Sequence, residues 1–257
     1  MKLAVFSDVH GNPYALRAVL QAIRARGRYD ALIVAGDLCM GGSDPAACVD
    51  LIQESGALAV YGNTEEYLRA PDQPPPDLHH SARWQFLSSA AHWTNAHLRP
   101  EQRQWLADLP FSLRFSPTAD ERDTLRVVHG NPKDNVLMLY PAPEGQTALW
   151  GEIRQPDEHP DLIDALHPLP EGSTLTFGHF HYTHERMWRG VRLINVACCS
   201  LPMIDHDPRA RFTEFEWRSG TWQVTRHWVE YNWQQEIAAL TASDLPQVEN
   251  FIQMFPK

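Results

Sequence analysis

Short apolar runs alternate with helix-like segments in the N-terminal part of the chain, and this alternation restricts the fold more than any other feature. The apolar runs at 2–6, 31–35 and 57–61 have the length of buried strands. Between them lie a segment that begins at Pro13, with apolar residues at helical spacing, and the segment 44–55. Consecutive parallel strands need a crossover of this kind. The pattern therefore predicts βαβ units and a parallel sheet.

The rest of the chain predicts a second sheet and a helical insertion. Residues 66–120 start with a proline-rich break and continue with helical stretches, so we expect an insertion or cap there within a single domain spanning 1–257. Further strands are expected at 125–128 and 175–177. The tail, 184–231, has several β-type runs, which predict a second, largely antiparallel sheet. The predicted fold class is α/β, a mixed two-sheet β-sandwich flanked by helices.

Charge and hydropathy exclude some classes of function. The net charge of −10 argues against extended nucleic-acid binding. The apolar run at the N-terminus reaches Asp8 too early for a signal peptide, and no apolar stretch approaches the roughly 20 residues of a membrane span. We therefore expect a cytoplasmic protein without a membrane partner, and homo-oligomerisation stays open.

The cysteines form no disulfide or metal framework. Cys39, Cys48, Cys198 and Cys199 contain no Cys-x-x-Cys spacing. We interpret them as small buried hydrophobic residues, with a redox or metal role for the adjacent pair Cys198 and Cys199 as the alternative.

Polar residues that can bind a metal follow five of the expected strands. They are Asp8, His10, Asp37, Asn63, His129, His179 and His181. The carboxyl ends of strands in an α/β sheet are where ligands bind, so these residues are expected to meet at one rim. Carboxylate and imidazole ligands together suit Mn²⁺, Fe or Zn²⁺. Asp37 is placed to bridge two ions, and two-metal sites promote displacement at phosphorus.

These segments resemble a known family. "FSDVHGN", "VAGDLCM", "VYGNTEE", "VVHGNP" and "FGHFH" are similar to the five signature blocks of the calcineurin-like metallophosphoesterase superfamily, with a short bacterial phosphodiesterase-like branch as the nearest match. The resemblance runs over most of the chain. It implies a four-layer αββα sandwich and a metal-dependent phosphoric ester hydrolase.

The resemblance also implies a dinuclear metal centre that holds two divalent ions, Mn²⁺ first, with Fe or Zn²⁺ as alternatives. The implied ligands of the first ion are Asp8, His10, Asp37 and His181, and those of the second are Asp37, Asn63, His129 and His179. A hydroxide that bridges the ions would attack phosphorus. Asp37, Asn63 and Thr64 form the implied catalytic set.

Thr64 departs from the family pattern, in which histidine is common after the Gly-Asn pair. A threonine cannot act as a general acid, although its hydroxyl can bind a phosphate oxygen. We therefore expect activated diesters or a polyphosphate anhydride as substrates, and Glu65 as a structural partner rather than the acid. Two further candidate substrate contacts are Asn12, which a helix-cap role explains equally well, and His184, for which an exposed strand position is the alternative.

The primary functional hypothesis is hydrolysis of phosphodiester bonds in a small phosphorylated substrate. Hydrolysis of a dinucleoside polyphosphate is the second hypothesis, for which Trp84, Trp93 and Trp105 would stack on a base instead of packing in the core. A metal-binding scaffold with little catalysis is the alternative from another class.

Overall fold

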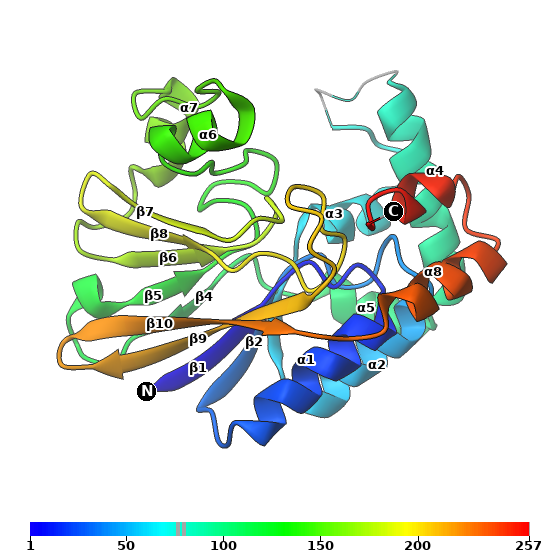
Figure 1. Cartoon of the computed structure of the whole chain (residues 1–257), viewed down its shortest axis with the longest axis horizontal. Coiled ribbons are helices and arrows are strands. Elements are labelled where there is room, and N and C mark those ends of the chain that lie inside the picture. Colours follow the sequence, from blue (N-terminus) through cyan, green and yellow to red (C-terminus); the bar gives the residue numbers. More distant parts are fainter. Residues whose placement is uncertain (76–77, 79–80, 257) are drawn as a thin grey trace.

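The computed structural model describes residues 1–75, 78 and 81–256 (Figure 1). Its strands are β1 (Lys2–Phe6), β2 (Ala31–Ala35), β3 (Leu58–Val60), β4 (Leu113–Phe115), β5 (Leu125–Val127), β6 (Thr174–Phe177), β7 (His184–Trp188), β8 (Val191–Asn195), β9 (Ala210–Arg218) and β10 (Thr221–Val229). Its helices are α1 (Pro13–Ala25), α2 (Pro45–Ser55), α3 (Asn63–Arg69), α4 (Ala82–His97), α5 (Pro100–Ala107), α6 (Pro143–Trp150), α7 (Pro160–Leu166), α8 (Trp233–Ala242) and α9 (Glu249–Ile252), with a short 3-10 helix at Glu121–Asp123.

The strands form two mixed five-stranded sheets, in the orders β10-β9-β1-β2-β3 and β4-β5-β6-β8-β7. In the first, β1, β2 and β3 are parallel, as the βαβ pattern predicts. The expectation that the tail forms one antiparallel sheet is wrong. β7 and β8 join the second sheet, whereas β9 pairs antiparallel with β1 in the first. The reason is that β2 covers one edge of β1 and leaves the other free to accept the β9–β10 hairpin.

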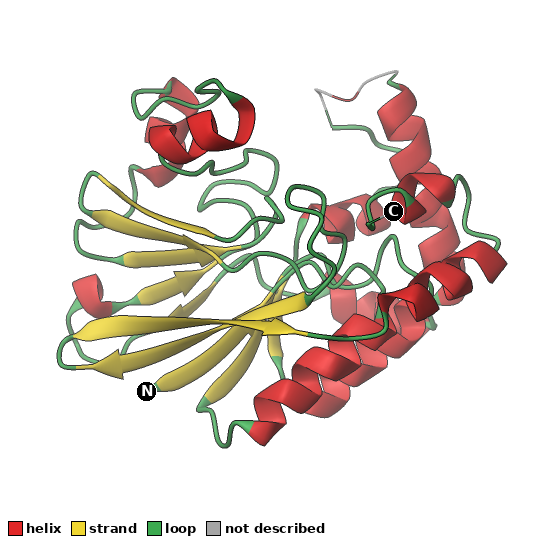
Figure 2. Ribbon diagram, in the orientation of Figure 1, coloured by secondary structure: helices red, strands yellow, loops and turns green. Residues whose placement is uncertain are grey.

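The two sheets stack face to face between helical layers (Figure 2). Alternation along β1 assigns its residues to two cores: Leu3 and Val5 pack between the sheets, while Ala4 and Phe6 face the helices. A third apolar cluster covers the outer face of the second sheet, where α7 contributes Leu162. These three apolar layers give the four-layer αββα arrangement.

Local sequence signals explain where the first helices begin. The Asn12 side chain accepts a hydrogen bond from the Ala15 amide, and Pro13 occupies the first position of α1. Asp44 caps α2 in the same way, and that helix ends at Gly56 in the left-handed conformation. Both helices therefore begin where the sequence predicts.

The proposed insertion at 66–120 stays a prediction. The segment contains α4 and α5, but it also contains β4, which pairs with β5 in the second sheet. No helix in the described part of the chain is long and apolar enough to span a membrane. All four cysteines are free and buried, and Cys39, Cys48 and Cys199 pack in the apolar cluster between the first sheet and the helices.

Candidate metal centre

The residues expected to bind metal lie in the loops that follow strands of both sheets. Asp8 and His10 follow β1, Asp37 follows β2, and Asn63 begins α3 directly after β3. His129 follows β5 in the second sheet, while His179 and His181 follow β6. Hydrogen bonds continue beyond the strands, from the Asp8 amide to the Gly36 carbonyl at 3.1 Å and from the Gly178 amide to the His129 carbonyl at 2.9 Å. These bonds hold the loops of each sheet together at one rim.

The side chains converge into two overlapping groups. One consists of Asp8, His10 and His181, and the other of Asp8, Asp37 and His129, with the ligand atoms of each group within 4.8 Å of one another. Asp8 therefore belongs to both groups, a role that the sequence assigned to Asp37 alone.

The remaining expected ligands adjoin these groups. The His10 Nε2 atom lies 3.5 Å from Asp37 Oδ2, which links Asp37 to the first group as well. The His129 Nε2 atom lies 2.9 Å from Asn63 Oδ1 and 3.2 Å from His179 Nδ1. All seven expected residues are thus brought together.

Backbone carbonyls orient the four imidazoles. The Nδ1 atoms of His10, His129 and His181 lie 2.9, 2.9 and 2.7 Å from the carbonyl oxygens of Met40, Ala35 and Leu201 respectively. Each Nδ1–H then donates to its carbonyl and leaves the Nε2 lone pair directed into the cluster. His179 is reversed: its Nε2 atom lies 3.2 Å from the Val136 carbonyl oxygen, and Nδ1 faces His129. Metal-binding histidines are characteristically held in this way.

The spacing of the ligand atoms fits a metal ion better than direct hydrogen bonding. The His10 and His181 Nε2 atoms are 3.2 Å apart, the same separation as that between His129 Nε2 and His179 Nδ1. In each pair, the proton of each neutral ring lies on the nitrogen that donates to a backbone carbonyl, so the two nitrogens that face each other both carry lone pairs and cannot hydrogen-bond to each other. Nitrogen ligands about 2.0–2.1 Å from a shared ion are about 3.0–3.4 Å from each other. The donor set therefore fits divalent cations.

Charges within the centre shift the pKa values of its members. Burial alone would raise the pKa of the Asp8 carboxyl, but His181, together with His129 and His10, holds that pKa well below its usual range. Burial opposes protonation of His181, yet the Asp8 carboxylate raises its pKa well above the ordinary value. Burial, together with the neighbouring His129, lowers the pKa of His179 to about 4. Without metal, His181 therefore retains a proton beside the Asp8 carboxylate, and a metal ion bound by these two residues would displace that proton.

Several of these residues have strained backbones. Asp8, His10, Asp37, His179 and His181 have φ values between 48° and 63°, in the left-handed region. Each such residue costs about 1–3 kcal/mol and persists where the surrounding structure imposes it. The strain concentrates at the loop positions that direct side chains into the centre.

Two glycines permit the close approach of the loops. A Cβ atom at Gly178 would lie 1.9 Å from Ser7 Oγ and 2.5 Å from Asp8 Oδ2. A Cβ atom at Gly62 would lie 2.2 Å from Asp37 Oδ1. Any larger residue at either position would displace a ligand carboxylate.

Thr64 lines the pocket and also hydrogen-bonds to Asp37, one of the residues expected to bind metal. Its hydroxyl donates to Asp37 Oδ1 at 2.9 Å, and its amide donates to the same oxygen at 3.0 Å. The neighbouring Glu65 carboxylate accepts hydrogen bonds from the amides of Asp37, Leu38 and Gly62 at 2.8–3.0 Å. Thr64 and Glu65 therefore fix Asp37 from its side chain and its backbone, and Glu65 is a structural partner as expected.

The other two candidate substrate contacts are used elsewhere. The Asn12 amide nitrogen donates to Ser200 Oγ at 2.9 Å while its oxygen caps α1, so its side chain is fully engaged. His184 is neither exposed nor part of the pocket at the centre. It is the first residue of β7 and faces inward, where its ring packs against Phe177 and Phe180 and its Nε2 atom lies 3.1 Å from the Leu139 carbonyl oxygen.

The tryptophans of the expected insertion pack in the core. Trp93 on α4 belongs to the apolar cluster between the first sheet and the helices, and Trp105 is partly buried against that cluster. Trp84 is buried on α4 against the Tyr67 ring. This confirms core packing, and none of the three lines the pocket above the metal ligands.

A pocket of about 160 Å³ opens above these ligands. His10, Asp37, Asn63, His179 and His181 lie at its base, together with Thr64. Sequence analysis missed its walls, which are largely apolar and include one arginine, Arg83 of α4. No motif marks these wall residues, because they reach the pocket through the packing of α4 and the C-terminal segment.

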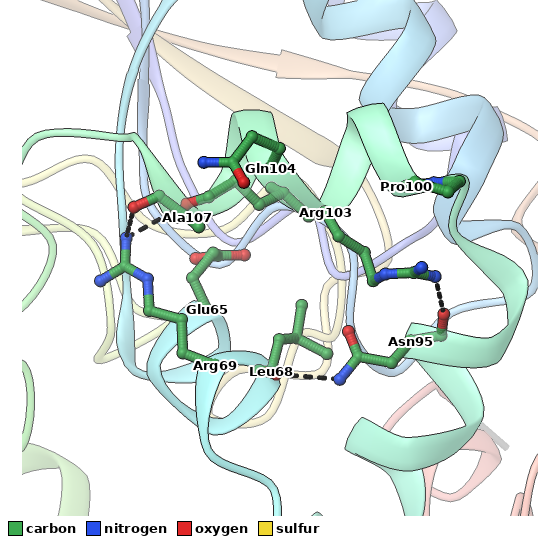
Figure 3. A pocket seen from close by; sticks show the side chains of 9 residues that line it. Glu65, Leu68, Arg69, Asn95, Pro100, Arg103, Gln104 and Ala107 are labelled. Atoms are coloured by element: carbon green, nitrogen blue, oxygen red, sulfur yellow. Dashed lines mark hydrogen bonds between the residues drawn. The ribbon is translucent and has the colours of Figure 1, made fainter.

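A larger pocket, about 520 Å³, lies on the far side of Glu65, between α3, α4 and α5 (Figure 3). There the Arg69 guanidinium donates to the Leu106 and Ala107 carbonyls, and Arg103 donates to the Asn95 carbonyl. None of the seven expected ligands lines this pocket. We therefore place the chemistry in the smaller pocket.

Comparison with known proteins places this geometry in context. The chain matches the family model described as calcineurin-like phosphoesterase over residues 1–194. Its fold is similar to that of a metallophosphoesterase from Sphaerobacter thermophilus, with a TM-score of 0.70 and 23% identity over 99% of this chain and 98% of the other. It is also similar to the hypothetical protein PH1004 from Pyrococcus horikoshii OT3, with a TM-score of 0.77 and 18% identity over 98% and 96% of the two chains.

A sequence relative matches over a shorter length. The uncharacterized protein MJ0912 of Methanocaldococcus jannaschii is 28% identical over 142 residues, which cover 55% of this chain and 54% of that protein. The match therefore spans about half the length of this relative.

Proposed function

Because the chain belongs to the calcineurin-like phosphoesterase family, we propose that it is a dinuclear, metal-dependent phosphodiesterase. The observation that carries the proposal is the orientation of the four histidines. Each has one ring nitrogen tied to a backbone carbonyl and the other directed at a cluster that contains Asp8 and Asp37. A scaffold without catalysis would not need this complete set.

In this proposal the side chains of the centre would bind two metal ions, and the ions would activate the phosphoryl group of the substrate. Asp8, His10, Asp37 and His181 would hold one ion, and Asp37, Asn63, His129 and His179 the other. When bound, two divalent ions act as Lewis acids toward phosphoryl oxygens and lower the pKa of bound water to about 7. Mn²⁺ is the ion we propose first, with Fe or Zn²⁺ as alternatives.

The pocket provides little proton assistance to a leaving group. Hydrolysis forms a bond from a water oxygen to phosphorus and breaks the P–O bond to an alcohol, which must then acquire a proton. Among the described residues that line the pocket, every histidine and the one carboxylate, Asp37, belong to the set expected to bind metal. The Thr64 hydroxyl already donates to Asp37. We therefore propose substrates whose alcohol leaves readily without a general acid.

The balance of charge in the pocket supports a diester over a monoester. Arg83 is the one lysine or arginine among the described lining residues, and most of the wall is apolar. A phosphodiester carries one negative charge and two organic groups, whereas a monoester is largely dianionic at neutral pH. The single charge of the diester matches one guanidinium, and its organic groups can contact the apolar wall.

The test is hydrolysis by metal-stripped protein reloaded with Mn²⁺, using methyl p-nitrophenyl phosphate and p-nitrophenyl phosphate. We expect faster turnover of the diester, and loss of turnover in Asp37→Asn. The matched control is Asp72→Asn, because the Asp72 side chain is 80% exposed, bonds to His92 and belongs neither to the expected ligands nor to the lining of this pocket. Preference for the monoester would refute the diesterase proposal, and metal-independent turnover would refute the metal mechanism.

A further inference from the structure

The wall of the pocket above the metal ligands is unusually rich in methionine and phenylalanine. Its apolar members are Met40, Phe86, Leu87, Met138, Leu201, Met203, Phe251 and Met254. They come from separate parts of the chain, including α4 and the C-terminal segment that begins with α9, which lie beside each other in Figure 1. The Phe86 and Phe251 rings are in contact, with centroids 4.9 Å apart. Methionine side chains adapt to apolar groups of varied shape.

Arg83 lines the same wall. It is exposed, and it makes no hydrogen bond or ion pair within the described part of the chain. Arg69, Arg99 and Arg103, by contrast, are each bonded to a carbonyl or carboxylate. In a chain with net charge −10, a free guanidinium beside the ligand cluster is available to an anion.

The helix places this charge and the apolar wall on one face. Phe86 and Leu87 follow Arg83 by three and four residues along α4, so the three side chains are neighbours on the helix surface. A ligand that reaches Arg83 with an anionic group therefore meets an apolar surface within one helical turn. The same pocket is also lined by His10, Asp37, Asn63, His179 and His181, which are expected to bind metal.

We infer that this protein acts on phosphodiesters with a large apolar substituent, either aryl or alkyl, and that Arg83 binds a phosphoryl oxygen while the wall holds the substituent. The inference rests on the proposed function and names its substrate class. A charge-assisted hydrogen bond from a guanidinium fixes the phosphoryl group beside the cluster. Burial of the substituent against Phe86, Leu87 and Met203 then favours apolar esters over small ones.

The first experiment varies the retained substituent at constant leaving group. Methyl, phenyl and octyl p-nitrophenyl phosphates are compared with Mn²⁺-loaded protein. We expect kcat/KM for the phenyl or octyl ester to exceed that for the methyl ester at least tenfold. A preference for octyl identifies an alkyl substituent and a preference for phenyl an aromatic one, and both support the inference. Equal kcat/KM values for the three esters would overturn it and leave the diesterase function standing.

Variants assign the preference to the named residues. Arg83→Gln is expected to lower kcat/KM for every ester at least tenfold, mainly through KM, and Arg83→Lys to restore part of the loss. Arg17→Gln is the matched control, because Arg17 is exposed on α1 and lines none of the described pockets. Met203→Gln is expected to reduce the ratio of octyl or phenyl to methyl ester several-fold. Met187→Gln, at an exposed position on β7, should leave that ratio unchanged.

An equilibrium measurement separates this inference from the proposed function. Calorimetric titration with methyl-, phenyl- and octylphosphonate needs no turnover. Tighter binding of phenyl- or octylphosphonate, weakened by Arg83→Gln but not by Arg17→Gln, supports the inference even if no ester is hydrolysed. Binding of the larger phosphonates no tighter than methylphosphonate overturns it.

Discussion

Replacement of Thr64 by valine tests whether this residue positions the carboxylate of Asp37. The Thr64 side chain is 4% exposed, and its hydroxyl donates to Asp37 Oδ1 at 2.9 Å. Valine keeps the shape and removes the donor. A hydrogen bond to a charged group contributes about 1.5–3 kcal/mol, and loss of a residue that orients a metal ligand typically weakens metal binding about 10–100-fold. Since the Thr64 amide still donates to the same oxygen, we expect a loss near the lower limit, about tenfold.

The assay is competition for Mn²⁺ between the protein and a chelator of known affinity. Thr64→Ser, which keeps the hydroxyl, should bind close to wild type. Thr94→Val is a matched control, because the Thr94 hydroxyl on α4 is buried and has no hydrogen-bond partner among the described residues. Thr64→Val with wild-type affinity for Mn²⁺ and a raised KM would refute the argument, and would indicate that the hydroxyl contacts substrate instead.

Two further predictions concern stability. Burial raises the pKa of the Glu236 carboxyl on α8 to about 7, although Ser43 donates two hydrogen bonds to it. In the unfolded chain this carboxyl loses its proton near its ordinary pKa of 4.5, whereas in the folded protein it keeps the proton up to about pH 7. The free energy of unfolding of the wild type should therefore fall between pH 5 and pH 8. In urea titrations, the stability of Glu236→Gln relative to wild type should rise by about 2–3 kcal/mol over that range, and a difference that does not change with pH would contradict this. Mn²⁺ at 100 times its Kd should raise Tm by about 5–10 °C in a thermal melt, reversed by chelator and absent in Asp37→Asn.

The clustering of the residues expected to bind metal could be predicted because each one lies in the loop or helix start that follows a strand. Once the runs 2–6 and 31–35 are recognised as parallel strands, Asp8 and Asp37 must lie at the same rim. The capping role of Asn12 could also be found locally, since cap and proline are adjacent in sequence. These features depend on short-range patterns.

Features that depend on distant packing could not be predicted in this way. Thr64 bonds to a carboxylate 27 residues earlier, and only the folded loops determine that this oxygen lies within reach of its hydroxyl. His184 sits in a strand-like run, but the pairing of β7 with β8 decides that its side chain faces inward. Arg83 and Phe251 meet at one pocket because α4 and α9 pack against the same core, and no periodicity in either segment indicates this.

The central position of β1 has a consequence for biosynthesis. Of the described strands this one is translated earliest, yet one of its two neighbours, β9, lies more than 200 residues later in the chain. Asp8 likewise contacts His181, which is translated 173 residues later. A nascent polypeptide therefore cannot present the whole ligand set to cellular metal ions until most of it has been translated. A partly translated chain could therefore bind an ion only through the few ligand residues that have already been synthesised.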